Sequence, residues 1–454
     1  MSLQNSHQIS EVKVMLTKGI DGNGIASIEK TGTEGLVDIY TITYTNGEKT
    51  TFTVTNGAGG GMSALLLITS DAGSEVTVTT PSGRTITAEQ VSGSSTQWQA
   101  ETTEYGVHTI DAVLAGSDAQ VTQNVDACKI YLIDDSHFSA SIMVKYPDGY
   151  TCRCQGTSES SYATGSPFTF SVHSADTYTI TVTDGTDTYT DTVVITTDGQ
   201  TESLTCPASA DAPANNLDFW LFYGDVSGTY STLADVLADS TALSTLMASS
   251  DAVDYLVRCT SWATDVCSDQ SAMSYIGLNN YASNTLLADS TWRTEICDST
   301  YFESVLNAKV PAMTSNTTPS GECFASFSEV TNREYFKAFT PNGGDGCATA
   351  LTSGSSYIGY GFESALKVYK FDGTIYTASS GGAISTSYTV DSSDDKSTWN
   401  ELTSGSTTYD TSANPRHLVE NLAPNASAKY YRLFINNTKN TLFKDFQFYG
   451  RVDV

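Results

Sequence analysis

An aliphatic residue recurs every ten positions between Ser231 and Val310, and this repeat is the strongest constraint on how the chain can fold. The repeated positions are Val236, Leu246, Leu256, Val266, Ile276, Leu286, Ile296 and Leu306. Asp239, Asn279 and similar side chains between the units are suited to cap helices. Helices this short are unstable alone, so we predict a stack of short helices over residues 217–313 with one continuous apolar stripe.

Two tryptophans of this repeat allow a functional alternative. Trp262 and Trp292 stand four positions before a repeated aliphatic residue, on the same face of a helix. A binding groove lined by these two rings is therefore one hypothesis. A buried core position for both is the other, because apolar stripes at helical spacing usually face a core.

Residues 1–61 contain a β hairpin. Residues 38–45 alternate with period two, Asn46-Gly47 supplies a tight turn, and residues 49–55 alternate again. The apolar face of this hairpin carries Tyr40, Ile42, Tyr44, Phe52 and Val54. A hairpin cannot bury such a face by itself, so we expect a symmetric homo-oligomer, taken to be a trimer, to cover it.

Residues 62–135 and 136–207 are predicted to form two immunoglobulin-like sandwiches. Both stretches consist of short alternating segments separated by Gly, Asp and Ser turns. Residues 76–83 match 142–149, and residues 105–110 match 176–180. We interpret the two sandwiches as spacers, since this fold alone implies no function.

Composition excludes several classes of partner. The chain has 22 basic against 51 acidic residues and a formal net charge of −29, which disfavours nucleic acid. The longest apolar run, 64–68, is too short to span a bilayer, so we expect no membrane partner. The nine cysteines lack metal-binding spacings and are expected to be free thiols. No secretory leader is recognisable, which favours a protein made and assembled in the cytoplasm of a host cell.

Residues 320–454 return to β patterns and predict a jelly roll. The pattern is carried by residues 356–362, 366–371, 388–402, 430–435 and 443–450. In order and type, these segments resemble the discoidin family, also called the coagulation-factor type C family of galactose-binding-like jelly rolls. That resemblance implies binding of sugars or other surface ligands by loops at one end of the sandwich, often beside a structural calcium loop.

Candidate site residues follow from this resemblance and from the chemistry of sugars. A glycan needs a ring to stack on and polar groups to hold hydroxyls, and Tyr376, Tyr409, Arg416 and His417 are candidates in predicted loops. Asp345 is the candidate calcium ligand, with an ion-free turn aspartate as the alternative. No cofactor is required. Trp399 and Arg432 are predicted to be structural, through packing and a buried hydrogen-bonded pair.

A second resemblance concerns the N-terminus. Residues 18–25, 28–31, 35–44 and 52–57 resemble the short N-terminal β segment of many phage tail and virion fibre proteins. The short helical repeat also resembles one found in phage tail proteins. These resemblances imply assembly onto a virion together with other virion proteins.

The sequence thus predicts a mainly β, multidomain phage virion protein that is not an enzyme. The five histidines fall in different segments, and no metalloprotease, nucleophile-elbow or phosphate-binding motif is present. We expect a tail or baseplate fibre that adheres to a host surface glycan. A head fibre or capsid decoration protein is the alternative within the virion, and a bacterial surface adhesin is the alternative of another class.

Overall fold

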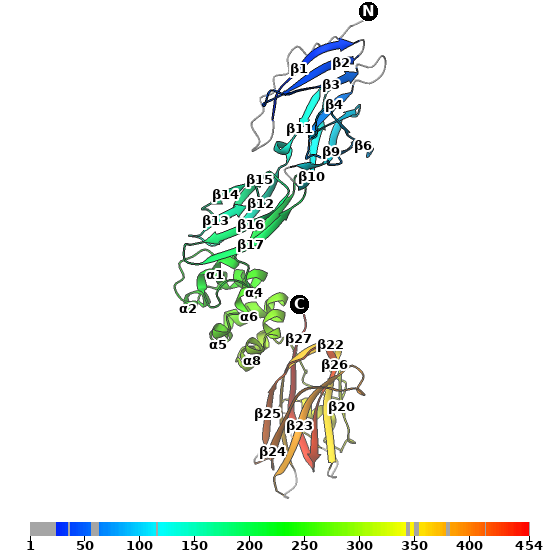
Figure 1. Cartoon of the computed structure of the whole chain (residues 1–454). Coiled ribbons are helices and arrows are strands. Elements are labelled where there is room, and N and C mark those ends of the chain that lie inside the picture. Colours follow the sequence, from blue (N-terminus) through cyan, green and yellow to red (C-terminus); the bar gives the residue numbers. More distant parts are fainter. Residues whose placement is uncertain are drawn as a thin grey trace, which may run out of the picture. The chain divides into compact units, whose positions relative to one another are not determined.

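The computed structural model describes residues 24–34, 37–55, 63–114, 117–341, 346–348, 354–377, 382–413 and 415–453. The chain forms two compact units, residues 1–208 and 209–454. Strands predominate in both units, and the α-helices lie in one stretch of the second unit (Figure 1), which confirms the mainly β, multidomain fold class. Within the described residues, every helix is too short or too polar to cross a bilayer.

The first unit begins with a three-stranded antiparallel sheet. Its strands are β1 (Ile25–Glu34), β2 (Val37–Tyr44) and β3 (Lys49–Thr55), in the order β1-β2-β3. The predicted hairpin between β2 and β3 is confirmed, and Gly47 adopts the positive φ of 85° that the tight turn needs.

The apolar face of this sheet is covered by the chain itself, not by a second copy. Ile42 and Phe52 are buried in a cluster with Leu65, Leu67 and Val91 of the following sandwich. This face therefore needs no second copy to cover it, contrary to the expectation from the sequence, because an apolar surface of the same chain lies against it.

Strand β4 (Ala64–Thr69) explains how one strand serves two cores. Leu66 and Ile68 face the interior of the sandwich, whereas Leu65 and Leu67 face the N-terminal sheet. A strand that is buried on both faces reads as a continuous apolar run instead of an alternating one. The run 64–68 is thus the sequence signature of this double contact.

The predicted pair of sandwiches is confirmed. The strands of the first are β4, β5 (Thr77–Thr79), β6 (Thr85–Thr87), β7 (Glu89–Gln90), β8 (Gln97–Thr102), β9 (Gly106–Leu114), β10 (Ser117–Val125) and β11 (Ile130–Ile133). Those of the second are β12 (Ala140–Lys145), β13 (Thr151–Gln155), β14 (Ser160–Ala163), β15 (Phe168–Val172), β16 (Asp176–Thr183), β17 (Thr188–Ile195) and β18 (Thr201–Thr205). A 3-10 turn, η1 (Asp135–His137), joins the two.

One of the two predicted strand correspondences is wrong. In each sandwich the first strand pairs in parallel with the last, β4 with β11 and β12 with β18. The equivalent of β12 is therefore β4, whereas the matched residues 76–83 include β5, which lies in the other sheet with β9. The false match came from the turns, because Gly83 and Gly149 adopt the same positive φ in different connections. The match of β9 with β16 is confirmed.

The ten-residue repeat forms the predicted stack of short helices. These are α1 (Leu217–Tyr223), α2 (Leu233–Leu237), α3 (Ser240–Ala248), α4 (Ser250–Leu256), η2 (Thr260–Trp262), α5 (Ala263–Ser268), α6 (Gln270–Leu278), α7 (Asn280–Ala288), α8 (Ser290–Asp298) and η3 (Phe302–Ser304). All eight repeated aliphatic side chains are buried. Asp239, Ser249, Asn279 and Asp289 cap helices through their side chains, and Asp269 does the same.

The groove hypothesis for the two tryptophans is wrong. Trp292 is fully buried, and its indole N–H donates to the carbonyl oxygen of Val257 at 3.0 Å. Trp262 packs on Trp220, with ring centroids 5.5 Å apart. Trp292 therefore belongs to the interior of the helical stack, and Trp262 is partly exposed beside the fully buried Trp220.

The second unit ends in a β sandwich. Its elements are β19 (Ala308–Lys309), β20 (Glu322–Ala325), η4 (Tyr335–Phe339), β21 (Cys347–Ala348), β22 (Gly354–Thr377), β23 (Ile384–Ser393), β24 (Asn400–Tyr409), β25 (Arg416–Asn421), β26 (Ala428–Thr438) and β27 (Thr441–Arg451). Strand β22 belongs to both sheets: its first part pairs with β20 and β26, and its second part pairs with β25 and β27. The jelly-roll prediction is consistent with this arrangement.

The helices and the sandwich share a polar seam. The Arg451 guanidinium donates to the carbonyl oxygens of Val305 and Gly277, at 2.9 and 3.1 Å, and to the Asn280 side chain at 2.9 Å. The Lys370 ammonium donates to the carbonyl oxygen of Cys297 and lies 4.1 Å from the centre of the Phe302 ring. Buried cations held by helix carbonyls fix the two parts to each other.

The two faces of β4 can be tested with neighbouring substitutions. We expect Leu66→Ala and Leu67→Ala each to lower the free energy of unfolding by about 2–5 kcal/mol, because both side chains are fully buried. Leu67→Ala should selectively speed hydrogen exchange of the β2 and β3 amides, whereas Leu66→Ala should loosen the sandwich. Equal protection of β2 and β3 in the two variants would contradict the double contact.

Candidate functional site

The structure does not gather all four predicted sugar-binding residues on one exposed surface. Tyr409 is not an exposed loop residue: it is buried at the end of β24, its hydroxyl lies 2.7 Å from that of Thr441, and burial raises its pKa. Tyr376 lies within strand β22 and is half-buried. A ring enclosed by the core has no face for a sugar, so Tyr409 is excluded from a site.

The other two residues begin strand β25. His417 is exposed and bridges β22, with its ring nitrogens 3.2 Å from an Asp372 carboxylate oxygen and 3.2 Å from the Thr374 hydroxyl. Arg416 is also exposed, but it stands opposite the inward-facing Ile375. The alternation of a strand therefore points Arg416 and His417 to opposite faces. Asp345, the candidate calcium ligand, lies outside the described residues.

A group of aromatic rings on the other sheet forms a better surface. We call Phe324, Tyr357, Trp399 and Tyr430 the ring platform. The Phe324 centroid lies 6.3, 6.0 and 5.9 Å from those of Tyr357, Trp399 and Tyr430, and Tyr357 lies 6.1 Å from Trp399. All four side chains are partly exposed. Neighbouring rings of this kind can stack against the apolar faces of sugars.

Two glycines of β22 make room for the platform. A Cβ at Gly359 would lie 2.5 Å from the Phe324 ring, and one at Gly361 would lie 2.6 Å from the Tyr430 ring. Ile358 and Tyr360, which alternate with these glycines along the strand, point into the core. One face of this strand thus supplies core side chains. On the other face, the two glycines leave the space into which the Phe324 and Tyr430 rings pack.

A buried ion pair lies among the platform rings. The Arg432 Nε donates to an Asp391 carboxylate oxygen at 2.8 Å, and both side chains are largely buried. The guanidinium carbon lies 4.0 Å from the Trp399 ring centre and 4.7 Å from that of Tyr357. The predicted buried pair of Arg432 is confirmed, and Trp399 packs on that guanidinium while part of its ring stays exposed.

The acidic turn before Trp399 brings a second cation to the platform. The Asp395 carboxylate accepts backbone N–H groups of Thr398 and Ser397 at 2.8 Å, and these bonds lower its pKa. Lys396 lies 4.9 Å from the Phe324 ring centre and 4.7 Å from that of Tyr430, and it pairs with Glu322 at 2.7 Å. Rings and hydrogen-bonding groups therefore occur together here.

Sequence reasoning missed the platform as a site. The alternation of Tyr430, Arg432 and Phe434 was a usable signal, because alternate residues of a strand share a face. Phe324 and Trp399 carried no such signal, since they come from β20 and from the β23–β24 turn.

Within the described part of the chain, no group of three or more His, Cys, Asp or Glu side chains is placed to hold a metal ion. All nine cysteines are free thiols, as predicted, and eight of them are buried.

Comparisons with known proteins give similarity only at the level of solved structures. No protein-family model matches the chain, and no curated protein matches it. One similar structure is the CBM32 of AlyQ in complex with 4,5-unsaturated mannuronic acid: 17% identity, TM-score 0.22, 30% of this chain and 98% of that one.

Two further similar structures come from glycan-active proteins. Chitosan-binding module 1 of a chitosanase/glucanase from Paenibacillus sp. IK-5 has 22% identity and a TM-score of 0.21, over 30% of this chain and 96% of that one. A putative alpha-L-fucosidase from Bacteroides thetaiotaomicron has 16% identity and a TM-score of 0.23 over 30% of this chain, but only 29% of the fucosidase is covered.

The buried pair can be tested by a double-mutant cycle. We expect Arg432→Met to cost about 3–5 kcal/mol of folding free energy, because it leaves the Asp391 carboxylate buried without a partner. Adding Asp391→Asn should recover part of this loss. Chemical denaturation of the two single variants and the double variant gives the coupling. Strictly additive costs would show that the pair does not act as a unit.

Proposed function

We propose that the protein is a non-enzymatic recognition protein of a phage particle, and that its C-terminal sandwich binds a host surface glycan through the ring platform. The observation that carries the glycan proposal is the set of four partly exposed rings that pack against one another beside Lys396 and Arg432. Rings that are already fixed lose little conformational entropy when a sugar stacks on them.

The virion part of the proposal rests on the resemblance of residues 18–57 to the N-terminal segment of phage fibre proteins. Tail or baseplate fibre is the preferred location, and a head fibre or capsid decoration protein is the second candidate. We assign no catalytic step. His108, His137 and His173 each contact a neighbour of their own in the first unit, and His417 lies in the second.

The glycan proposal predicts a specific loss of binding. We expect Tyr430→Ala to weaken binding of the full-length chain to its best glycan about tenfold, the loss expected for one stacking contact. Tyr162→Ala removes a highly exposed tyrosine from the first unit and serves as the matched control, with no expected effect. Glycan arrays find the ligand, and titration calorimetry measures both variants.

Absence of wild-type binding to every glycan and to host cells would contradict the glycan proposal. If the two tyrosine variants weakened glycan binding equally, the binding site would not be the ring platform.

The virion proposal is tested on purified particles of the phage that encodes the chain. Mass spectrometry should detect the protein, and immunogold labelling should place it on the tail or baseplate. Labelling of the head would favour the second candidate, and absence from the particles would refute both.

A further inference from the structure

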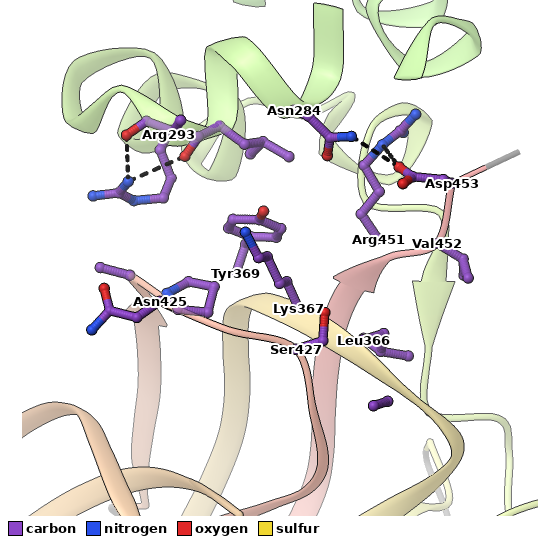
Figure 2. A pocket seen from close by; sticks show the side chains of 15 residues that line it. Asn284, Arg293, Leu366, Lys367, Tyr369, Asn425, Ser427, Arg451, Val452 and Asp453 are labelled. Atoms are coloured by element: carbon purple, nitrogen blue, oxygen red, sulfur yellow. Dashed lines mark hydrogen bonds and ion pairs between the residues drawn. The ribbon is translucent and has the colours of Figure 1, made fainter. Parts of the chain in front are cut away.

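A pocket of about 740 Å³ lies at the polar seam, away from the ring platform residues. It is open to solvent on one side and is lined by α7, α8, the bend of β22, the β25–β26 loop and the end of β27 (Figure 2). In this view Lys367 and Tyr369 rise from β22 toward the helices, with Asn425 and Ser427 on the loop beside them. Pockets of this volume accommodate small organic ligands.

The charge of this pocket is opposite to that of the chain. The protein as a whole has 51 acidic and 22 basic residues, but the charged lining consists of Arg293, Lys367 and Arg451 against Asp453. Arg293 donates to the Leu287 and Ala288 carbonyl oxygens at 3.1 and 3.4 Å, and neither it nor Lys367 forms an ion pair with a described residue. Cations therefore outnumber their local counter-charges.

Arg451 provides a second, independent indication that this pocket favours an anion. Its side chain is only 2% exposed, yet its Nε has no hydrogen-bond partner among the described residues. The facing carboxylate oxygen of Asp453 is 3.9 Å away, and Asn284 donates to that oxygen at 3.0 Å. Burial lowers the pKa of Arg451, as expected for a charge with little compensation. Buried charges are normally paired with an opposite charge in hydrogen-bond contact. Among the described residues, no carboxylate comes that close to the Arg451 guanidinium.

We propose that this pocket binds a small anionic polyol, namely a sugar that carries a carboxylate or a phosphate group. Lys367, which is partly exposed, supplies a charge-assisted hydrogen bond to the oxyanion, and the buried Arg451 guanidinium adds positive charge beside it. Asn425, Ser427 and the Tyr369 hydroxyl supply donors and acceptors for sugar hydroxyls. The helical stack is then one wall of a binding site in addition to its part in the fold. This site is independent of the ring platform and its glycan.

The test compares three probes of similar size on the full-length chain: glucuronate, glucose 6-phosphate and glucose. We expect at least one anionic probe to bind, with an affinity at least about tenfold above that of glucose, and to weaken as salt is added. Binding of glucuronate alone identifies a carboxylate ligand, and binding of glucose 6-phosphate alone identifies a phosphate ligand. Titration calorimetry gives the three affinities.

Two lysine variants locate the site. Lys367→Gln should lower the affinity for the anionic probe about tenfold, as expected for the loss of one charge-assisted hydrogen bond. Lys444→Gln removes the same charge from another part of the sandwich and should leave binding unchanged. Thermal melting should show that both variants fold like the wild type, because each lysine is partly exposed.

Three results would overturn the inference: equal affinity for glucose, no binding of either anionic probe, or full binding by Lys367→Gln. Tyr430→Ala should bind the anionic probe with wild-type affinity, so this test can fail or succeed independently of glycan binding at the ring platform.

Discussion

The second unit depends on the burial of two cations where the helical stack meets the sandwich. Arg451 and Lys370 both come from strands of the sandwich, and both donate to backbone carbonyl oxygens of the helical region. Moving a charge out of water is costly, and these carbonyls offset only part of that cost. The seam therefore orders the two parts and at the same time leaves local positive charge.

The positive charge left at this junction also affects which ligands the protein can bind there. A protein with a net charge of −29 repels anions at long range, yet its junction pocket is lined by three cations and one carboxylate. The ring platform has a different character, because its cations are already engaged by Asp391 and Glu322. The two surfaces thus favour different ligands: apolar sugar faces on the platform and an oxyanion in the pocket.

In the first unit, one strand likewise joins two parts of the fold, through apolar contacts instead of buried cations. Strand β4 supplies Leu65 and Leu67 to the N-terminal sheet, and Ala64, Leu66 and Ile68 to its own sandwich. A hairpin that would be marginal alone is stabilised by this contact within one chain. The need for an oligomer at this face disappears, although fibre assembly through other surfaces stays a prediction.

Local pattern in the sequence determined most of the fold. The ten-residue repeat predicted buried aliphatic positions and caps, Asn46-Gly47 predicted the hairpin, and alternation predicted the sandwiches, because each of these signals acts over a few residues. Strand pairing and side-chain surroundings were decided only in three dimensions. Similar turns at Gly83 and Gly149 misled the strand match, and Tyr409 proved to be core.

Neither the ring platform nor the pocket could be predicted from the sequence, and the reason is the same for both. Phe324, Tyr357, Trp399 and Tyr430 come from four separate segments. The pocket joins Arg293 of a helix to Lys367, more than seventy positions away, and to Arg451, more than 150 positions away. Chemistry that arises from such contacts depends on distance in space, which the order of residues along the chain does not specify.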